Sequence, residues 1–330
     1  MADVQLSGLT KSFGATRALS DMTMTIADGS FVVLLGPTGA GKTTTLRLIA
    51  GLDRPDKGDI SIDGRSVLSD TPAQRDVAMV FQQYSLYPHL TVRENLAFPL
   101  RSPVLNWPEP DIARKIGEVA EVLRISHKLD NKATQLSGGE MQRVSIGRAL
   151  VRSPRIYLMD EPLSSLDAKL RADLRIELKR IHAELGATFL YVTHDQIEAM
   201  TMASHVGVLD QGKLVQFGTP REIYENPVST YVASRLGQPR INLLPADAFG
   251  AAKPGAAQIG LRPEHVILGE GQPATVRRVE HLGDQTRLHL TMGTHEIVTL
   301  ADPHTTLAPG DAVAIRPETP LWFDASGNRI

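Results

Sequence analysis

The sequence contains no cysteine, and its 330 residues carry almost balanced charge, with 35 basic and 37 acidic side chains. The absence of cysteine excludes disulfides, a cysteine nucleophile and thiolate zinc sites. The balanced charge provides no overall field to hold DNA or an acidic membrane surface, so we expect no nucleic-acid partner. The N-terminal segment also lacks the apolar core of a signal peptide.

Long hydrophobic runs are missing as well. The longest stretch without Asp, Glu, Lys or Arg is residues 77–92, which still contains two Gln, a Ser, a Pro and a His. A bilayer span needs about 20 predominantly apolar residues, so this stretch is not predicted to cross a membrane. If the protein acts at a membrane, we expect other chains to supply the spanning helices.

Short apolar runs and amphipathic segments alternate along most of the chain. Runs without polar alternation are typical of strands buried on both faces of a parallel sheet; they are residues 31–35, 77–81, 156–159, 189–192 and 206–209. Helical spacing of apolar residues marks 112–123 and 170–185, and the second segment has Asp167 as a candidate N-cap and Gly186 as a stop signal. The pattern predicts an α/β domain over residues 1–235.

The composition changes near Arg235. Residues 239–330 hold nine of the 21 prolines, and the apolar runs between them are short and bounded by turn residues. These features predict a second domain over residues 236–330, a small all-β, OB-like fold. Within it, the segment 260–265 (GLRPEH) is echoed by 314–319 (AIRPET), which suggests an internal duplication.

A glycine-rich segment ending in Lys-Thr follows the first buried run. Residues 36–43 read Gly-Pro-Thr-Gly-Ala-Gly-Lys-Thr, the pattern of a phosphate-binding loop. Its glycines allow consecutive backbone N–H groups to face one phosphate at the start of a helix. Lys42 would reach the β- and γ-phosphates, and the hydroxyl of Thr43 is a hard oxygen ligand for Mg²⁺. The segment lies between a strand pattern and a helix pattern, as this motif requires.

Two carboxylates end the run at 156–159. The ends of strands in an open α/β sheet are where ligands bind. Asp160 can hold Mg²⁺, usually through water, and Glu161 can accept a proton from an attacking water molecule. Residues 136–143 (LSGGEMQR) open another helix, in which Ser137 fits an N-cap and two glycines leave the helix start uncovered. This helix start is a second candidate anion site.

Together these motifs make the sequence resemble the ATP-binding subunits of ABC transporters over residues 1 to about 235. The resemblance implies a P-loop ABC ATPase core with a helical subdomain at about 84–153. It implies that Glu161, His194, Lys42 and Gln82 act in catalysis and that Thr43, Gln82 and Asp160 bind Mg²⁺. The residues that it assigns to ATP are Phe13, Gly36, Pro37, Thr38, Gly39, Ala40, Gly41, Lys42, Thr43, Thr44, Ser137, Gly138, Gly139, Glu140 and Asp167.

The resemblance also implies partners. In this family the phosphate loop of one subunit and the signature segment of another enclose each ATP; the signature segment corresponds here to residues 136–143. A chain with one phosphate loop and one signature segment must therefore dimerise. We expect a homodimer, two transmembrane permease subunits, and a solute-binding protein reached through the complex. The expected location is peripheral, at the cytoplasmic face of a bacterial inner membrane. Segments 260–265 and 279–286 resemble the β domain of maltose-type carbohydrate importers, which favours a sugar, polyol or glycosyl-glycerol solute.

Three features of the sequence depart from the family pattern. Glu140 stands where Gln is frequent, the β domain is shorter than in many maltose-type relatives, and residues 101–110 contain three prolines with no assigned role. A polyamine or metal-chelate importer remains an alternative. Soluble ABC ATPases of translation or DNA repair are disfavoured, since the chain has neither a second ATPase core nor a long coiled-coil insertion. The signature disfavours a small-molecule P-loop kinase.

Overall fold

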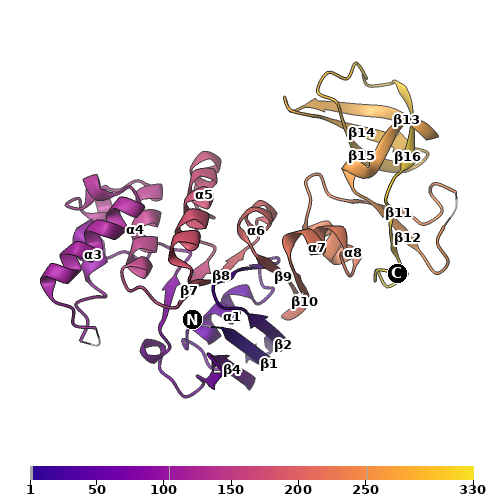
Figure 1. Ribbon diagram of the computed structural model, residues 1–330. Coiled ribbons are helices and arrows are strands. Elements are labelled where there is room, and N and C mark those ends of the chain that lie inside the picture. Colours follow the sequence, from indigo (N-terminus) through magenta and orange to yellow (C-terminus); the bar gives the residue numbers. More distant parts are fainter. Residues whose placement is uncertain (1–2, 104, 251) are drawn as a thin grey trace. The chain divides into compact units, whose positions relative to one another are not determined.

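The computed structural model describes residues 3–103, 105–250 and 252–330. They form two compact units, Met1–Pro220 and Arg221–Ile330, and each is described by itself (Figure 1). Among the described residues, none of the helices has both the length and the apolar character that a membrane span requires.

The central sheet of the first unit has six strands in the order β10-β9-β3-β8-β7-β6. The strands from β9 to β6 run parallel, whereas β10 is antiparallel to β9. Their bounds are β3 (Phe31–Leu35), β6 (Val77–Val80), β7 (Ile156–Asp160), β8 (Thr188–Thr193), β9 (His205–Asp210) and β10 (Lys213–Gly218). All five apolar runs singled out in the sequence form strands of this sheet, so the prediction of a buried parallel sheet is confirmed.

A second, antiparallel sheet in this unit has the order β2-β1-β4-β5. Its strands are β1 (Val4–Phe13), β2 (Thr16–Ile26), β4 (Lys57–Ile62) and β5 (Arg65–Ser66). One apolar core joins this sheet to α1 (Lys42–Ile49) and the central sheet, through residues such as Leu6, Leu46 and Leu158. The phosphate-loop segment therefore begins and ends on elements fixed by one shared core.

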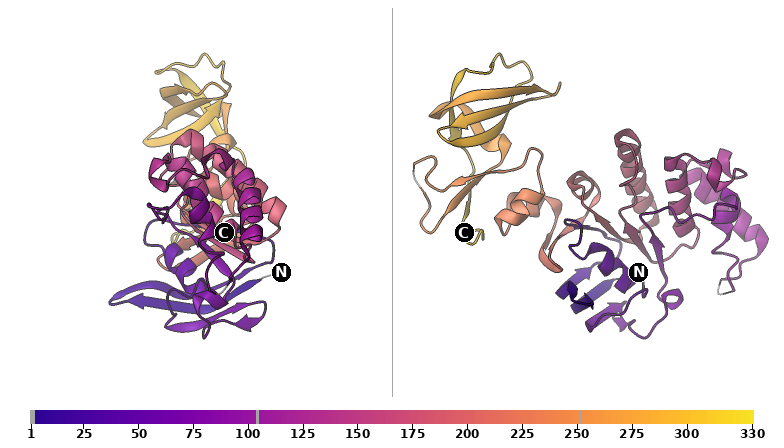
Figure 2. Two further views of the ribbon diagram at one scale, coloured as in Figure 1. Left: turned by 90° about the vertical axis from the view of Figure 1, so that its left-hand side faces the viewer. Right: turned by 180° about the vertical axis from the view of Figure 1, so that it is seen from behind.

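Helices α2 (Val92–Ala97), α3 (Glu109–Val122) and α4 (Gly138–Leu150) lie within the range 84–153. They contact one another, and α3 and α4 group together in Figures 1 and 2. In the segment 101–110, the guanidinium of Arg101 makes two hydrogen bonds with the Glu109 carboxylate, at 2.7 and 2.8 Å. Arg101 is therefore tied to the first turn of α3.

Helices α5 (Ala168–Leu185) and α6 (Gln196–Met202) complete the first unit. Asp167 caps α5 by accepting from the Leu170 N–H, and Gly186 ends it in the left-handed conformation with φ 61°. Both boundaries were predicted from the sequence. Short 3₁₀ turns occur at Pro72–Gln74, Ser126–Lys128, Ala133–Gln135 and Pro263–His265.

The second unit contains two short helices and two sheets. The helices are α7 (Pro220–Glu225) and α8 (Thr230–Arg235); α7 begins at the last residue of the first unit. One sheet has the order β11 (Asn242–Pro245), β12 (Gln258–Leu261), β17 (Leu321–Phe323). The other has the order β15 (His295–Ala301), β14 (Thr286–Met292), β13 (Val266–His281), β16 (Ala312–Pro317).

The boundary between the units lies at 220/221, not at the predicted 235/236. Ala233 of α8 belongs to an apolar cluster with Ile241, Leu321 and Phe323. The buried guanidinium of Arg262 donates to the carbonyls of Ala233 and Tyr224, both at 2.9 Å. Both helices are therefore tied to the β unit by contacts that a change in proline content does not reveal.

The two Arg-Pro-Glu segments have different surroundings. Arg262 is 2% exposed and bonded to helix carbonyls, whereas Arg316 is in an exposed ion pair with Glu270. Pro263 opens a 3₁₀ turn, whereas Pro317 ends β16. The repeat in sequence does not correspond to a repeated packing arrangement.

Candidate functional site

The phosphate-loop segment joins the end of β3 to the start of α1. A Cβ at Gly36 would lie 2.7 Å from the Leu209 carbonyl oxygen, and one at Gly41 would lie 2.6 Å from the Ala18 carbonyl oxygen. Gly41 also has φ 100°, a conformation that L side chains rarely adopt. Only glycine therefore fits the two ends of this loop, which pack closely against the backbone at Leu209 and Ala18.

Lys42 is the first residue of α1 and is 5% exposed. Its ammonium donates to the carbonyls of Gly36 and Pro37, at 2.9 and 3.1 Å. It also lies 3.4 Å from Oε1 of Glu161. A buried ammonium needs such partners, because burial takes away its hydrogen bonds to water. The cation is thus held inside the loop.

Thr43 and Asp160 meet across the site. The Thr43 hydroxyl donates to Oδ1 of Asp160 at 2.9 Å, although α1 and β7 are far apart in the sequence. Burial is the main cause that raises the pKa of Asp160, and the charge of Glu161 adds to it, while the bond from Thr43 acts in the opposite direction. A hydroxyl beside a desolvated carboxylate is a donor set that suits Mg²⁺, whose charge would favour the ionised acid.

Glu161 follows β7 with φ 43°, an uncommon backbone conformation for a non-glycine residue. Its N–H donates to the Val192 carbonyl at 3.1 Å, which fixes the backbone to β8. One carboxylate oxygen faces Lys42, and the other lies 3.0 Å from Nδ1 of His194. The unusual backbone therefore aims the carboxylate between a cation and an imidazole, and strain of this kind is frequent at functional sites.

The structure brings together five of the predicted residues at the carboxyl ends of β3, β7 and β8, namely Lys42, Thr43, Asp160, Glu161 and His194. The remaining loop positions surround them: Pro37 and Thr44 are half-buried, Thr38 and Gly39 are exposed, and Ala40 is buried.

The signature segment makes its contacts elsewhere. Ser137 caps α4, and the carboxylate of Glu140 accepts from the backbone N–H of Ser137 at 2.8 Å. This bond is the main cause that lowers the pKa of Glu140, and Lys128 lies 3.2 Å from the same carboxylate. A Cβ at Gly139 would lie 2.2 Å from a methyl group of Leu170. Glu140, whose presence the family pattern left unexplained, thus completes a capping box.

Three further predicted residues are exposed at the surface. The Phe13 ring is 50% exposed at the end of β1, and the Lys11 ammonium lies 5.3 Å from its centroid. Gln82 is exposed in the loop after β6. Asp167 accepts from the Leu170 N–H at 3.0 Å. The surroundings of these residues place them at surfaces where another molecule has access.

Sequence reasoning missed two residues beside the site. The Tyr84 hydroxyl lies 3.1 Å from the Ser165 hydroxyl, and the Arg171 guanidinium bonds to the Leu166 carbonyl and faces Asp195. Arg171 comes four residues after Asp167, on the first turn of a helix whose cap was predicted. That spacing could have indicated that Arg171 lies beside the cap, whereas no local sequence pattern indicates that Tyr84 contacts Ser165.

Comparisons with known proteins agree with this geometry. The family model described as ABC transporter matches residues 19–164, and the TOBE domain model matches residues 259–321. An sn-glycerol-3-phosphate import ATP-binding protein of Ruegeria sp. (strain TM1040) is 44% identical, covering 100% of this chain and 99% of its own. The protein of the same name from Rhizobium meliloti (strain 1021) is also 44% identical, covering 100% of both chains.

Solved structures resemble the first unit. A bacterial ABC transporter cassette described as dimeric has 30% identity and a TM-score of 0.60, covering 66% of this chain and 99% of its own. An ATP-binding cassette from another ABC transporter has 27% identity and a TM-score of 0.63, covering 70% and 98%. With full-length relatives at this identity and a matching site, the chain belongs to the ABC transporter family, as an import-type ATP-binding subunit with ATPase activity.

Proposed function

We propose that this chain powers the uptake of a sugar, polyol or glycosyl-glycerol solute as a homodimer bound to two permease subunits. The observation that carries the proposal is the convergence of Lys42, the Thr43–Asp160 pair and the Glu161–His194 pair at one edge of the sheet. The full-length relatives named for sn-glycerol-3-phosphate import support the solute class and make that compound the first to test.

In this proposal the chain's own groups bind ATP and move one proton. The loop N–H groups and Lys42 hold the phosphates, and the exposed Phe13 ring offers a stacking surface for adenine. Glu161 takes the proton of the attacking water, and His194 holds that carboxylate by the 3.0 Å contact. Phosphoryl transfer requires positioning and charge neutralisation rather than a covalent intermediate.

Mg²⁺ fits the Thr43 and Asp160 oxygens, because the carboxylate is desolvated and already shares a hydrogen bond with the hydroxyl. We assign Gln82, from the loop after β6, as a further ligand. When bound, the ion would neutralise charge on the β- and γ-phosphates.

The way the signature segment is held supports the homodimer. Ser137 and Glu140 cap α4, Lys128 pairs with Glu140, and Gly139 abuts Leu170, so these contacts come from segments other than the phosphate loop. The start of α4 can then face a nucleotide bound to a second copy, with Asp167 nearby at the start of α5. The solved relative described as dimeric supports this arrangement.

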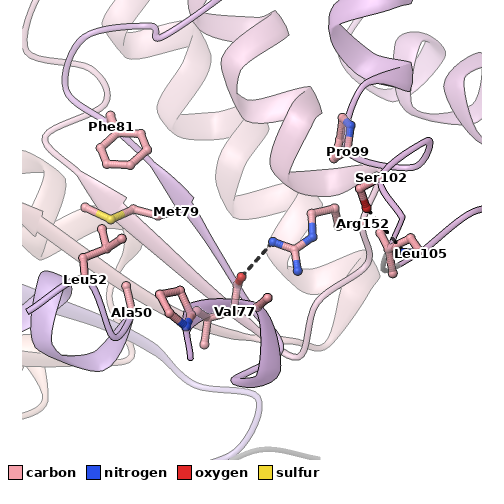
Figure 3. A pocket seen from close by; sticks show the side chains of 11 residues that line it. Ala50, Leu52, Val77, Met79, Phe81, Pro99, Ser102, Leu105 and Arg152 are labelled. Atoms are coloured by element: carbon pink, nitrogen blue, oxygen red, sulfur yellow. Dashed lines mark hydrogen bonds between the residues drawn. The ribbon is translucent and has the colours of Figure 1, made fainter. Parts of the chain in front are cut away.

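A permease contact is proposed at an apolar pocket of about 400 Å³ in the first unit (Figure 3). Leu52, Met79, Phe81 and Leu105 are among its lining residues, and the Arg152 guanidinium donates to the Val77 carbonyl at 3.1 Å at its edge. Phe81 directly precedes Gln82, so a segment seated in this pocket would adjoin the loop assigned to Mg²⁺. This contact would place the chain peripherally, at the cytoplasmic face of the membrane.

The test is reconstitution with the proteins encoded by neighbouring reading frames. Proteoliposomes containing the complex and its binding protein would be loaded with Mg-ATP, and uptake of labelled sn-glycerol-3-phosphate, maltose, a polyamine and a ferric chelate would be compared. We expect ATP-dependent uptake of a polyol or sugar compound, lost in Lys42→Ala. Uptake of the polyamine or chelate alone would assign the alternative importer class. ATP turnover without permease association would contradict the transport assignment.

A further inference from the structure

The Arg171 guanidinium lies between two loops of the site. Nη2 donates to the Leu166 carbonyl at 2.9 Å, and Nη1 lies 3.5 Å from Oδ2 of Asp195, the residue after His194. We propose that Arg171 is a positioning residue that holds the Ser164–Asp167 loop and the His194 turn as one unit. The inference rests on the proposed function, in which Asp167, at the end of this loop, lies near the nucleotide of a second copy and His194 holds the Glu161 carboxylate.

The His194 turn is fixed through Asp195. The Asp195 N–H donates to the Thr193 hydroxyl at 3.0 Å, and Oδ1 accepts from the Ile197 N–H at 2.7 Å as the cap of α6. The second carboxylate oxygen is the one that faces Arg171. A shift of the guanidinium would therefore act on Asp195. This residue is next to His194, and the ring of His194 contacts Glu161.

The loop side is fixed to the start of α5. Asp167 caps the helix, and the Arg171 N–H donates to the Asp167 carbonyl at 2.9 Å. The bond from the Arg171 side chain to Leu166 adds a second attachment one residue earlier. Contact of a partner with this loop would thus be transmitted along a single side chain to Asp195.

The local charges also favour a cation at this position, beside the hydrogen bonds from Thr193 and Tyr191 to Glu198 that act in the same direction. Glu198, on α6, is 2% exposed and bonded to the Tyr191 hydroxyl at 2.8 Å. Burial raises the pKa of Glu198, the charge of Asp195 raises it further, and Arg171 acts in the opposite direction. Without Arg171, the two acids would lie close together with their repulsion no longer offset by this cation. The turn would then be expected to rearrange.

An ordinary stabilising ion pair is the competing explanation. The Arg171 and Asp195 side chains are 31% and 20% exposed, and pairs with such access to water contribute little to stability. A stabilising role would change the melting temperature and leave turnover per folded molecule unchanged. A positioning role would lower kcat and leave the KM for Mg-ATP nearly unchanged, since the bonds that the two residues make among the described residues run to residues such as Leu166, Thr193 and Ile197 rather than to the phosphate loop.

The experiment measures steady-state ATPase activity of the full-length chain against Mg-ATP concentration. The variants are Arg171→Gln, Arg171→Lys, Asp195→Asn and the double variant Arg171→Gln/Asp195→Asn; Arg175→Gln, one turn further along α5, is the matched control. Asparagine at 195 keeps the helix cap while removing the charge. Lysine at 171 keeps the charge but lacks the fork that reaches both loops.

We expect Arg171→Gln and Asp195→Asn each to lower kcat by about 10- to 100-fold, the effect of a catalytic group displaced by about 1 Å. The double variant should lose little beyond the worse single variant, because the two residues act as one unit. Arg171→Lys should be intermediate, and Arg175→Gln should match wild type.

Turnover of Arg171→Gln within about twofold of wild type, well below the cost of a misplaced group, would overturn the inference. The inference would also be overturned if the kcat loss of the double variant equalled the product of the two single losses. It would be overturned as well if the kcat losses followed the folded fraction measured by circular dichroism. Wild type and Glu161→Gln are assayed first. If Glu161→Gln turns over normally, the proposed site is wrong; if it does not and Arg171→Gln is normal, only this inference fails.

Discussion

Replacing Glu161 with glutamine removes one charge and leaves the size of the side chain unchanged. The amide oxygen can still face Lys42 or His194, so the contacts that place the side chain persist in part. The amide cannot take a proton from water, so hydrolysis should slow by roughly 10²–10⁴-fold, the usual contribution of a positioned general base. ATP binding should remain, because in the proposed site the loop N–H groups and Lys42, rather than residue 161, would hold the phosphates.

The same change has a second consequence that the structure predicts. Lys42 and Glu161 are 5% and 15% exposed, and removing one partner of a buried ion pair can cost about 3–5 kcal/mol. Because Lys42 keeps its bonds to Gly36 and Pro37, the loss should be below that range. Without added nucleotide the variant should melt below wild type, and Mg-ATP should raise its melting temperature more than it does for wild type.

The measurements are phosphate release, thermal melting, and light scattering coupled to size exclusion with and without Mg-ATP. The slow variant should accumulate as a nucleotide-dependent dimer, since ATP shared by two subunits favours assembly by mass action. Glu184→Gln, at an exposed ion pair on α5, is the matched control and should resemble wild type in all three assays. Near-normal phosphate release from Glu161→Gln would remove this residue from the catalytic role.

Three other changes test separate parts of the site. In a mixed dimer, Lys42→Ala in one subunit and Ser137→Arg in the other damage the same composite site and leave the second site intact. Phosphate release by the mixed dimer should therefore exceed that of either mutant homodimer, unless the two sites are obligately coupled. Gly139→Ala should lower ATPase activity, because its Cβ would lie 2.2 Å from Leu170 and displace the start of α4; a wild-type rate would contradict this. Asp160→Asn should abolish Mg-dependent turnover. It should nevertheless raise the metal-free melting temperature by about 2–4 °C, which is the effect of about 1 kcal/mol in a domain of this size. An unchanged or lower melting temperature would refute the reasoning.

The difference in melting temperature between Asp160→Asn and wild type should depend on pH in a definite direction. Burial raises the pKa of this carboxyl above its unfolded value, so the folded state binds the proton more tightly. Asp160 therefore destabilises the metal-free fold as pH rises from the unfolded pKa through the raised folded pKa. The advantage of Asp160→Asn in melting temperature should shrink as pH falls from the raised pKa towards the unfolded pKa, and it should be absent below the unfolded pKa. Mg²⁺ requires the ionised form, so its affinity should fall over the same descent in pH.

The parts of the fold that the sequence predicted are those with strong local signals. Residues 156–160 are apolar up to Asp160, and they form a strand buried along its whole length. Asp167 and Gly186 bound α5 as their cap preferences indicate. The antiparallel sheet at the N-terminus had a signal that was not used, because Met22, Met24 and Ile26 alternate with exposed residues along β2.

Long-range contacts account for what was missed. Ala233 of α8 is buried by Leu321 and Phe323, about a quarter of the chain later, so the proline content could not place the boundary between the units. In the site, the motifs predicted which residues matter, but the 3.0 Å contact between Glu161 and His194 depends on the left-handed backbone of Glu161. No pattern of residues in the sequence predicts that conformation for a glutamate.

The Lys42 contacts suggest how binding and hydrolysis are linked in one site. Its present hydrogen-bond acceptors are two neutral carbonyls, and the Glu161 carboxylate is its ion-pair partner. Phosphate oxygens carry more charge than carbonyls and form stronger hydrogen bonds with an ammonium, so we expect Lys42 to exchange partners when ATP enters. Glu161 would then lose its cation at Oε1 and keep His194 at Oε2. The exchange leaves one carboxylate oxygen available to water only after the phosphates have taken Lys42, so the base becomes available in the complex where it is needed.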